Sequence, residues 1–212
     1  MRLYLLLLSV FSLLIASQSC KSYTPAGTSI SSSASTVVEN TYFSSPETDY
    51  LYRTQIEIYG NNLTGILIIK KISDDTHRVA MTTDFGNKML DFEISDTAFK
   101  INYLIPDLDR KVVKNILEKD FRALLKENYD VTEVSEDAAF KIFATENPKG
   151  KNFLFYGKKD GLLKKTVITQ NGKEKVNFLF DGKSAIFADS ITLIHKDFRL
   201  KIKLNHIKPE SE

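Results

Sequence analysis

Residues 90–125 read LDFEISDTAFKINYLIPDLDRKVVKNILEKDFRALL and contain both of the patterns that decide the fold. In the first part, large apolar side chains occupy every second position: Leu90, Phe92 and Ile94, and then Phe99, Ile101 and Tyr103. Alternation with a period of two is typical of strands that bury one side and expose the other. It predicts two strands, over 87–95 and 98–105.

The second part changes to a spacing of three and four residues, which is typical of an amphipathic helix. Pro106-Asp107 is a helix start signal, with Asp107 as the expected N-cap. We expect one helix of about 20 residues that ends before Asn128. Its apolar stripe is Leu108, Val112, Val113, Ile116, Leu117, Phe121, Leu124 and Leu125, and basic side chains occupy much of the opposite side.

Alternating segments recur on both sides of this stretch, separated by turn residues such as Gly60-Asn61-Asn62 and Asn171-Gly172. Asn-Gly is favoured in two-residue hairpin turns because both positions need positive φ. Further strands are predicted over 50–59, 63–72, 77–83, 138–146, 152–158, 161–169, 173–180, 185–194 and 197–207.

These patterns predict a mainly β fold of about eleven antiparallel strands, with one long amphipathic helix after the fifth. A single twisted sheet of that size tends to curl. We therefore expect a curled half-barrel with the helix as a lid, and a cavity between them suited to an apolar ligand. The predicted cavity lining is Leu90, Phe92, Ile94, Phe99, Ile101, Tyr103, Ile116, Leu117, Phe178, Phe198, Leu200 and Ile202.

The first twenty residues have a different pattern. Arg2 precedes an apolar run from Leu3 to Ile15, and small residues lead to Cys20, the single cysteine of the chain. The run suits a signal peptide and is shorter than the roughly 20 residues that span a bilayer. Residues 1–19 resemble a bacterial lipoprotein signal peptide, which implies that Cys20 carries the lipid anchor. An uncleaved anchor helix and an ordinary secretory signal with a free Cys20 are the alternatives.

Residues 20–48 then comprise the lipidated cysteine and a Ser-rich segment with few large apolar side chains. Such a segment is expected to be a flexible tether with a reach of about 30 Å. The folded domain is predicted over 49–208.

Composition excludes several classes of protein. Without residues 1–19 the chain has 193 residues, with 28 basic and 27 acidic side chains. That length predicts one domain, expected to be a monomer, and the charge balance gives no signal for nucleic acid. His77, His195 and His206 lack metal-ligand spacing, and His195 is expected to be solvated in a turn. We find no phosphate loop or nucleophile motif, so we expect no enzyme, cofactor or metal.

The turn at Asp84-Phe85-Gly86 places a large aromatic side chain at its tip. Burial of a phenylalanine is worth roughly 1.5–3 kcal/mol, so an apolar destination is expected. Phe85 either inserts into a membrane interface or folds back onto the body as a plug of the core.

Thr82-Thr83-Asp84-Phe85-Gly86 resembles the Thr-x-x-Leu-Gly loop of the LolB family of outer-membrane lipoprotein receptors. The hairpin over 166–178 and the last two strands, with Ser190-Ile191-Thr192-Leu193 and 198–204, also resemble that family, and the likeness extends over roughly 50–207.

The resemblance implies a LolA/LolB-like half-barrel that accepts acyl chains of lipoproteins from a periplasmic carrier. Phe85 would take the place of the family's membrane-inserting leucine. The protein would be lipid-anchored in the outer membrane, facing the periplasm, and would pass the chains to membrane lipid. A structural or assembly lipoprotein that binds another apolar ligand or a protein partner with the same fold is the alternative.

Overall fold

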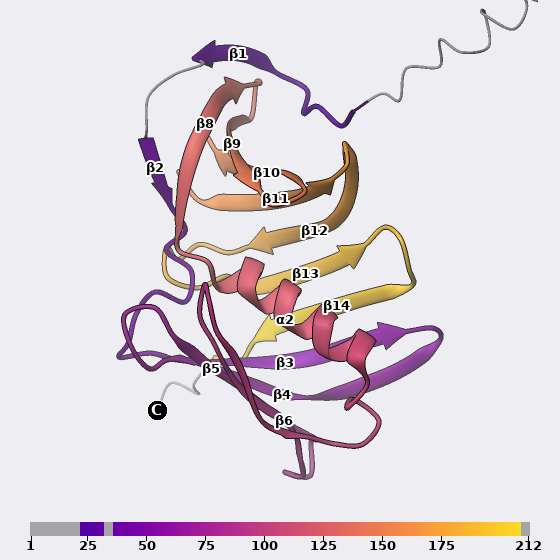
Figure 1. Cartoon of the computed structure of the whole chain (residues 1–212). Coiled ribbons are helices and arrows are strands. Elements are labelled where there is room, and N and C mark those ends of the chain that lie inside the picture. Colours follow the sequence, from indigo (N-terminus) through magenta and orange to yellow (C-terminus); the bar gives the residue numbers. More distant parts are fainter. Residues whose placement is uncertain (1–21, 32–35, 209–212) are drawn as a thin grey trace, which may run out of the picture.

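A computed structural model of the chain describes residues 22–31 and 36–208. Figure 1 shows a long curved sheet with a helix on its concave side. The helix is α2, Lys111–Leu125. The strands are β1 Thr28–Ser31, β2 Thr36–Glu39, β3 Asp49–Ile58, β4 Asn61–Lys71, β5 His77–Thr82, β6 Lys88–Ile94, β7 Phe99–Leu104, β8 Asn128–Glu136, β9 Phe140–Asn147, β10 Gly150–Gly157, β11 Leu163–Gln170, β12 Lys173–Asp181, β13 Ser190–His195 and β14 Leu200–His206.

Every strand pairing in the sheet is antiparallel. The order is β1-β8-β9-β10-β11-β12-β13-β14-β3-β4-β5-β6-β7, with β2 also on β8. The prediction of a mainly β fold with a curled antiparallel sheet and one helix is confirmed. The described residues form fourteen strands, however, and not eleven.

The topology explains why the helix crosses the sheet. The strands form two meanders, β3–β7 and β8–β14, which are joined where β14 pairs with β3. This pairing leaves β7 at one edge of the sheet and β8 near the other. Because α2 connects β7 to β8, it has to pass over the sheet from one edge towards the other.

The helix begins later than the sequence predicts. Asp107 is not its N-cap, because Pro106–Asp109 form a tight turn in which the Leu108 and Asp109 amides donate to the Ile105 carbonyl. Arg110 is the N-cap, and its side chain makes no capping hydrogen bond. Val112, which was placed on the apolar stripe, is 69% exposed and lies on the outer side of the helix, whereas its neighbour Val113 packs against the core.

The predicted flexible tether is part of the fold over its described length. Its strands β1 and β2 both pair with β8, a strand that the sequence analysis missed. Tyr42 and Phe43 are fully buried, and the Tyr42 hydroxyl donates to the Leu163 carbonyl at 3.1 Å. The folded body therefore starts before residue 49. The sequence signal for this earlier start was the presence of two apolar pairs, Val37-Val38 and Tyr42-Phe43, within the Ser-rich segment.

Candidate functional site

The apolar side of α2 lies against the concave face of the sheet (Figure 1). Leu117, Phe121, Leu124 and Leu125 of the helix are buried in the main core. The Phe121 ring packs edge-to-face on Phe92 of β6, with the ring centroids 5.2 Å apart. The helix therefore closes the sheet by apolar contact, which the spacing of its apolar residues predicts.

Most of the predicted cavity residues meet at this interface. Those that are buried in the main core are Leu90, Phe92, Ile94, Leu117, Phe178, Leu200 and Ile202. Phe99, Ile116 and Phe198 are partly buried and pack against the same core. Alternation along the strands was enough to place Phe178 and Ile202, whose strand pairings are regular there. The helical spacing placed Ile116 and Leu117. Phe198 lies in the turn before β14 and not in the strand predicted over 197–207.

Two residues of β7 do not belong to this interior. Tyr103 is 43% exposed and stands opposite Asp91, because a bulge between Asp91 and Phe92 puts one extra residue into β7. The Lys88 ammonium lies 5.9 Å from the centre of the Tyr103 ring. Ile101 stands opposite Phe92 but is 37% exposed on the edge strand. The predicted lining was therefore wrong for Tyr103 and for Ile101.

The concave side is closed in this structure by the helix itself. The buried side chains of α2 and of the sheet form one continuous core. The space that was expected to receive a ligand is therefore occupied by Leu117, Phe121 and Leu124. An apolar ligand on this face would have to displace α2.

A buried polar pair joins α2 to the sheet. His195 Nε2 of β13 lies 2.8 Å from Asp120 Oδ2, and both side chains are almost completely buried. Burial raises the pKa of the Asp120 carboxyl, and the hydrogen bond from His195 opposes that shift. His195 is therefore not the solvated turn residue that was expected. Its partner is 75 residues away in the chain, so local sequence gave no signal for the pair.

A second polar contact lies nearer the end of the helix. The Arg122 guanidinium donates to the Ser95 carbonyl, next to the β6–β7 turn, and also to Glu118 at 2.6 Å. Together with the Asp120–His195 pair, it fixes the helix over the apolar face.

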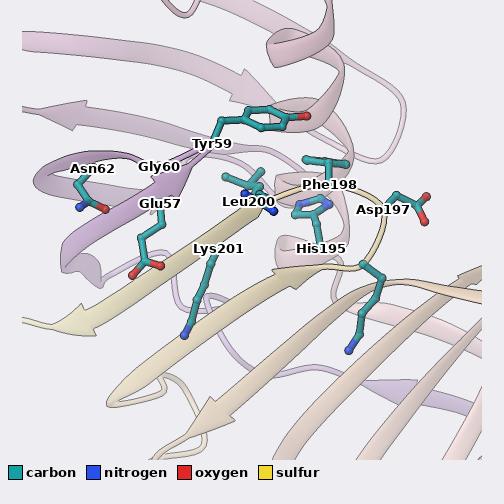
Figure 2. A pocket seen from close by; sticks show the side chains of 11 residues that line it. Glu57, Tyr59, Gly60, Asn62, His195, Asp197, Phe198, Leu200 and Lys201 are labelled. Atoms are coloured by element: carbon teal, nitrogen blue, oxygen red, sulfur yellow. The ribbon is translucent and has the colours of Figure 1, made fainter.

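An open cavity of about 710 Å³ lies at one end of the sheet, between the β3–β4 and β13–β14 turns. Figure 2 shows His195 and Phe198 side by side in it, and their ring centroids are 4.4 Å apart. Its rim is mixed, with Glu57, Tyr59, Asp197, Arg199 and Lys201. Because His195 lines the cavity and also holds α2, the cavity reaches the polar contact that closes the concave face.

The turn that carries Phe85 is fixed to the neighbouring strands. Arg53 Nη1 lies 2.7 Å from Asp84 Oδ1, and the Thr64 hydroxyl donates to Asp84 Oδ2 at 3.3 Å. The Gly86 amide donates to the Thr83 carbonyl, with Gly86 at a φ of 84°. Phe85 is 95% exposed. It is therefore not a plug of the core, and membrane insertion stays a prediction.

The remaining predictions concern the lipid anchor, metal binding and membrane-spanning helices. Cys20, the predicted lipid anchor, lies outside the described residues. Within residues 22–31 and 36–208, no three His, Cys, Asp or Glu side chains are grouped so that they could hold a metal ion. No helix in the same residues combines the length and apolarity needed to cross a bilayer.

Comparison with known proteins gives a match at the level of structure. Neither a family model nor a curated protein sequence matches the chain. A LolA superfamily protein from Nitrosomonas europaea superposes with a TM-score of 0.51 over 80% of this chain and 88% of that chain, at 7% identity. The fold is LolA-like.

Two other solved structures are similar to a lesser degree. A DUF1329 family protein from Desulfovibrio piger covers 76% of this chain and 84% of its own, with a TM-score of 0.44 and 8% identity. A domain assigned to outer-membrane lipoprotein sorting, from Vibrio parahaemolyticus, covers 76% and 83%, with a TM-score of 0.45 and 8% identity. At these identities the likeness is one of fold, and it does not distinguish LolB from other LolA-like proteins.

Proposed function

We propose that this protein is a lipid-anchored receptor that takes the acyl chains of lipoproteins onto the concave face of its LolA-like sheet and passes them to the membrane. The observation that carries the proposal is the large apolar face covered by one helix. Transfer of this kind breaks no covalent bond, and its driving force is the cost of exposing hydrocarbon to water.

The free-energy cost of displacing α2 is comparable with the free energy gained when an acyl chain is buried in its place. Displacing α2 uncovers its four buried apolar side chains, at roughly 1.5–3 kcal/mol each. Burial of an acyl chain returns about 0.8 kcal/mol per methylene, so a chain of about fifteen methylenes offsets that cost. The closed state is then the resting state, and the ligand takes the place of the helix side chains.

The open cavity supports a route for the chain. Phe198 and Leu200 line it beside His195, the residue that holds Asp120 of α2. An acyl chain that enters there meets the polar contact of the lid first. Separation of Asp120 from His195 would remove one of the two polar contacts that hold the helix on the sheet.

The rest of the proposal concerns the membrane. Cys20 would hold the protein in the outer membrane, facing the periplasm, and a periplasmic carrier would deliver the lipoprotein. Phe85 would insert into the lipid during release. Its fixed turn supports this role, because the side chain is held in water with no route back to the core.

Binding to the soluble chain tests the proposal. A chain of residues 20–212 with Cys20→Ser should bind a fluorescent fatty acid saturably, and a triacylated lipopeptide should displace the probe. Ile116→Glu puts a charge on the inner side of α2, which weakens the packing of the helix on the sheet and should therefore strengthen binding, because the ligand has to displace α2. Val112→Glu is the matched control on the exposed side and should not.

Circular dichroism and thermal melting of both variants should show an intact fold. Absence of saturable binding by the parent chain would contradict the proposal. Equal binding by the two variants would also contradict it, because the probe would then bind away from the helix-covered face.

A further inference from the structure

Several turns gather at the end of the sheet where the cavity opens. The strands alternate in direction, so the β9–β10, β11–β12, β13–β14, β3–β4 and β5–β6 turns all lie at this end. The Asn171 amide donates to the Lys149 carbonyl at 2.8 Å, and the Tyr59 amide donates to the Arg199 carbonyl at 3.1 Å. Neighbouring turns are therefore joined into a continuous edge. We name residues 59–60, 148–149, 171–173 and 196–199 the anchor rim.

The start of the described chain lies on the same rim. The Tyr23 amide donates to the Gly172 carbonyl at 2.7 Å, and the Tyr23 ring packs on Phe153 with centroids 5.3 Å apart. Figure 1 shows the β11–β12, β13–β14 and β3–β4 turns on the side of the molecule where the chain begins. Two residues lie between Cys20 and Tyr23, and an extended chain spans at most about 11 Å over those three steps.

The anchor rim is basic. Lys149, Lys173, Lys196 and Arg199 are exposed on it, and its one acidic residue, Asp197, is paired with Lys175 at 2.7 Å. The β5–β6 turn at the same end adds Asp84, which is paired with Arg53 at 2.7 Å. Among the described residues, neither Lys149 nor Lys173 has an ion-pair partner. The loop before α2 lies at the same end and is balanced, with Asp107 and Asp109 against Arg110 and Lys111.

The opposite end of the sheet is acidic. Its turns are β4–β5, β6–β7, β8–β9, β10–β11 and β12–β13, and their charged residues are Asp74, Asp75, Asp96, Asp137, Lys158, Lys159, Asp160, Lys183 and Asp189. The net charge of the whole chain is small, so the charge difference between the two ends comes from where the charged residues lie and not from an overall excess of one sign. The molecule is therefore electrically polar along its strands.

We infer that the anchor rim rests on an anionic phospholipid surface beside the lipid anchor. This inference rests on the membrane anchoring in the proposed function. A lysine near an anionic membrane gains about 1 kcal/mol, and an exposed aromatic side chain such as Tyr59 suits the bilayer interface. Such an orientation opens the cavity towards the lipid and points the acidic end away from it.

Vesicle binding of the unlipidated chain tests the inference. The chain of residues 20–212 with Cys20→Ser retains every described residue. It should sediment with vesicles of equal parts phosphatidylcholine and phosphatidylglycerol, and less with phosphatidylcholine alone. The double variant Lys149→Glu/Lys173→Glu should lose at least about tenfold in affinity for the anionic vesicles. The control Lys159→Glu/Lys183→Glu has the same net charge change at the opposite end and should lose less than about twofold.

Equal losses in the two double variants would overturn the inference, because attraction would then follow net charge alone. Equal binding to both kinds of vesicle would overturn it too. Fatty-acid binding separates this result from the proposed function. The anchor-rim variants should bind fatty acid like the parent chain. If the parent chain binds fatty acid but no anionic vesicle, the inference about the anchor rim is wrong and the proposed acyl-chain site is unaffected.

Discussion

At the scale of single residues, the decisive contacts are those between positions far apart in the chain. Asp120 and His195 are each unremarkable in their local sequence, yet they form the buried polar link between lid and sheet. For Tyr103, by contrast, the local sequence gave a clear prediction that was wrong. Its alternation with Asn102 and Lys100 predicted an inward side chain, and one bulge reversed that direction. Inner residues such as Phe178 and Ile202 were predictable because no bulge interrupts the strand pairing at their positions.

Phe85 gives a residue-scale prediction about the membrane. Phe85→Ser should leave the free energy of unfolding within about 0.5 kcal/mol of the parent, because the side chain is exposed and packs on nothing. The same variant should bind vesicles more weakly and release lipoprotein to them more slowly. Urea unfolding and vesicle sedimentation measure the two effects. Unchanged release would remove the role assigned to Phe85.

His77 gives a prediction about pH. Burial lowers its pKa from the ordinary value of 6.5, with Nε2 placed 2.9 Å from the Phe43 carbonyl. The folded state therefore resists protonation. The stability that His77 contributes is complete above the unfolded pKa and is lost as pH falls through the lower folded pKa.

Urea unfolding at about pH 7 and about pH 5 measures this effect. The parent chain should lose more stability between the two conditions than His77→Gln, which removes the titration. Some loss should remain in the variant because the pKa of His206 is also lowered by burial. Identical losses in the two chains would show that His77 does not contribute.

At the scale of elements, strong local patterns predicted the hairpins and the helix. The Asn171-Gly172 turn has both residues at positive φ, which its sequence favours. β8 was missed because only Tyr129 and Val131 are buried in it, and most of its other residues are polar. Strands β1 and β2 were missed because each has only four residues and pairs with β8, which was itself not predicted.

The two sides of α2 should respond differently to truncation. Leu124→Ala removes a fully buried side chain and should lower the free energy of unfolding by about 2–5 kcal/mol. Val112→Ala changes an exposed position of the same helix and should change it by less than about 0.5 kcal/mol. Chemical denaturation measures both. Similar small effects would mean that α2 does not pack on the sheet.

At the scale of the whole molecule, the pairing of β14 with β3 joins the two meanders into one sheet and brings the last strand beside the first long one. Local sequence patterns contain no information about such a pairing. The curl, the helical lid and the LolA-like fold were predictable from strand number and from the resemblance to known proteins. The packed state of the interior was not, because it depends on how the side chains of α2 fill the concave face.

The extent of the folded body gives a whole-molecule prediction. A chain of residues 49–212 lacks β1, β2, Tyr42 and Phe43, and should be unfolded or much less stable. Each buried aromatic is worth about 3–5 kcal/mol on truncation to alanine. A chain of residues 36–212 keeps β2 and both aromatics and should retain a cooperative melt. Equal stability of the two chains would place the start of the fold at residue 49.

In the proposed transfer, α2 gives way to an acyl chain on the concave face. Hydrogen exchange of the Cys20→Ser chain, with and without a triacylated lipopeptide, measures this directly. Faster exchange over residues 111–125 upon binding, with β6 and β12 unchanged or better protected, is the predicted result. Lipopeptide binding that leaves exchange in α2 unaltered would contradict the claim.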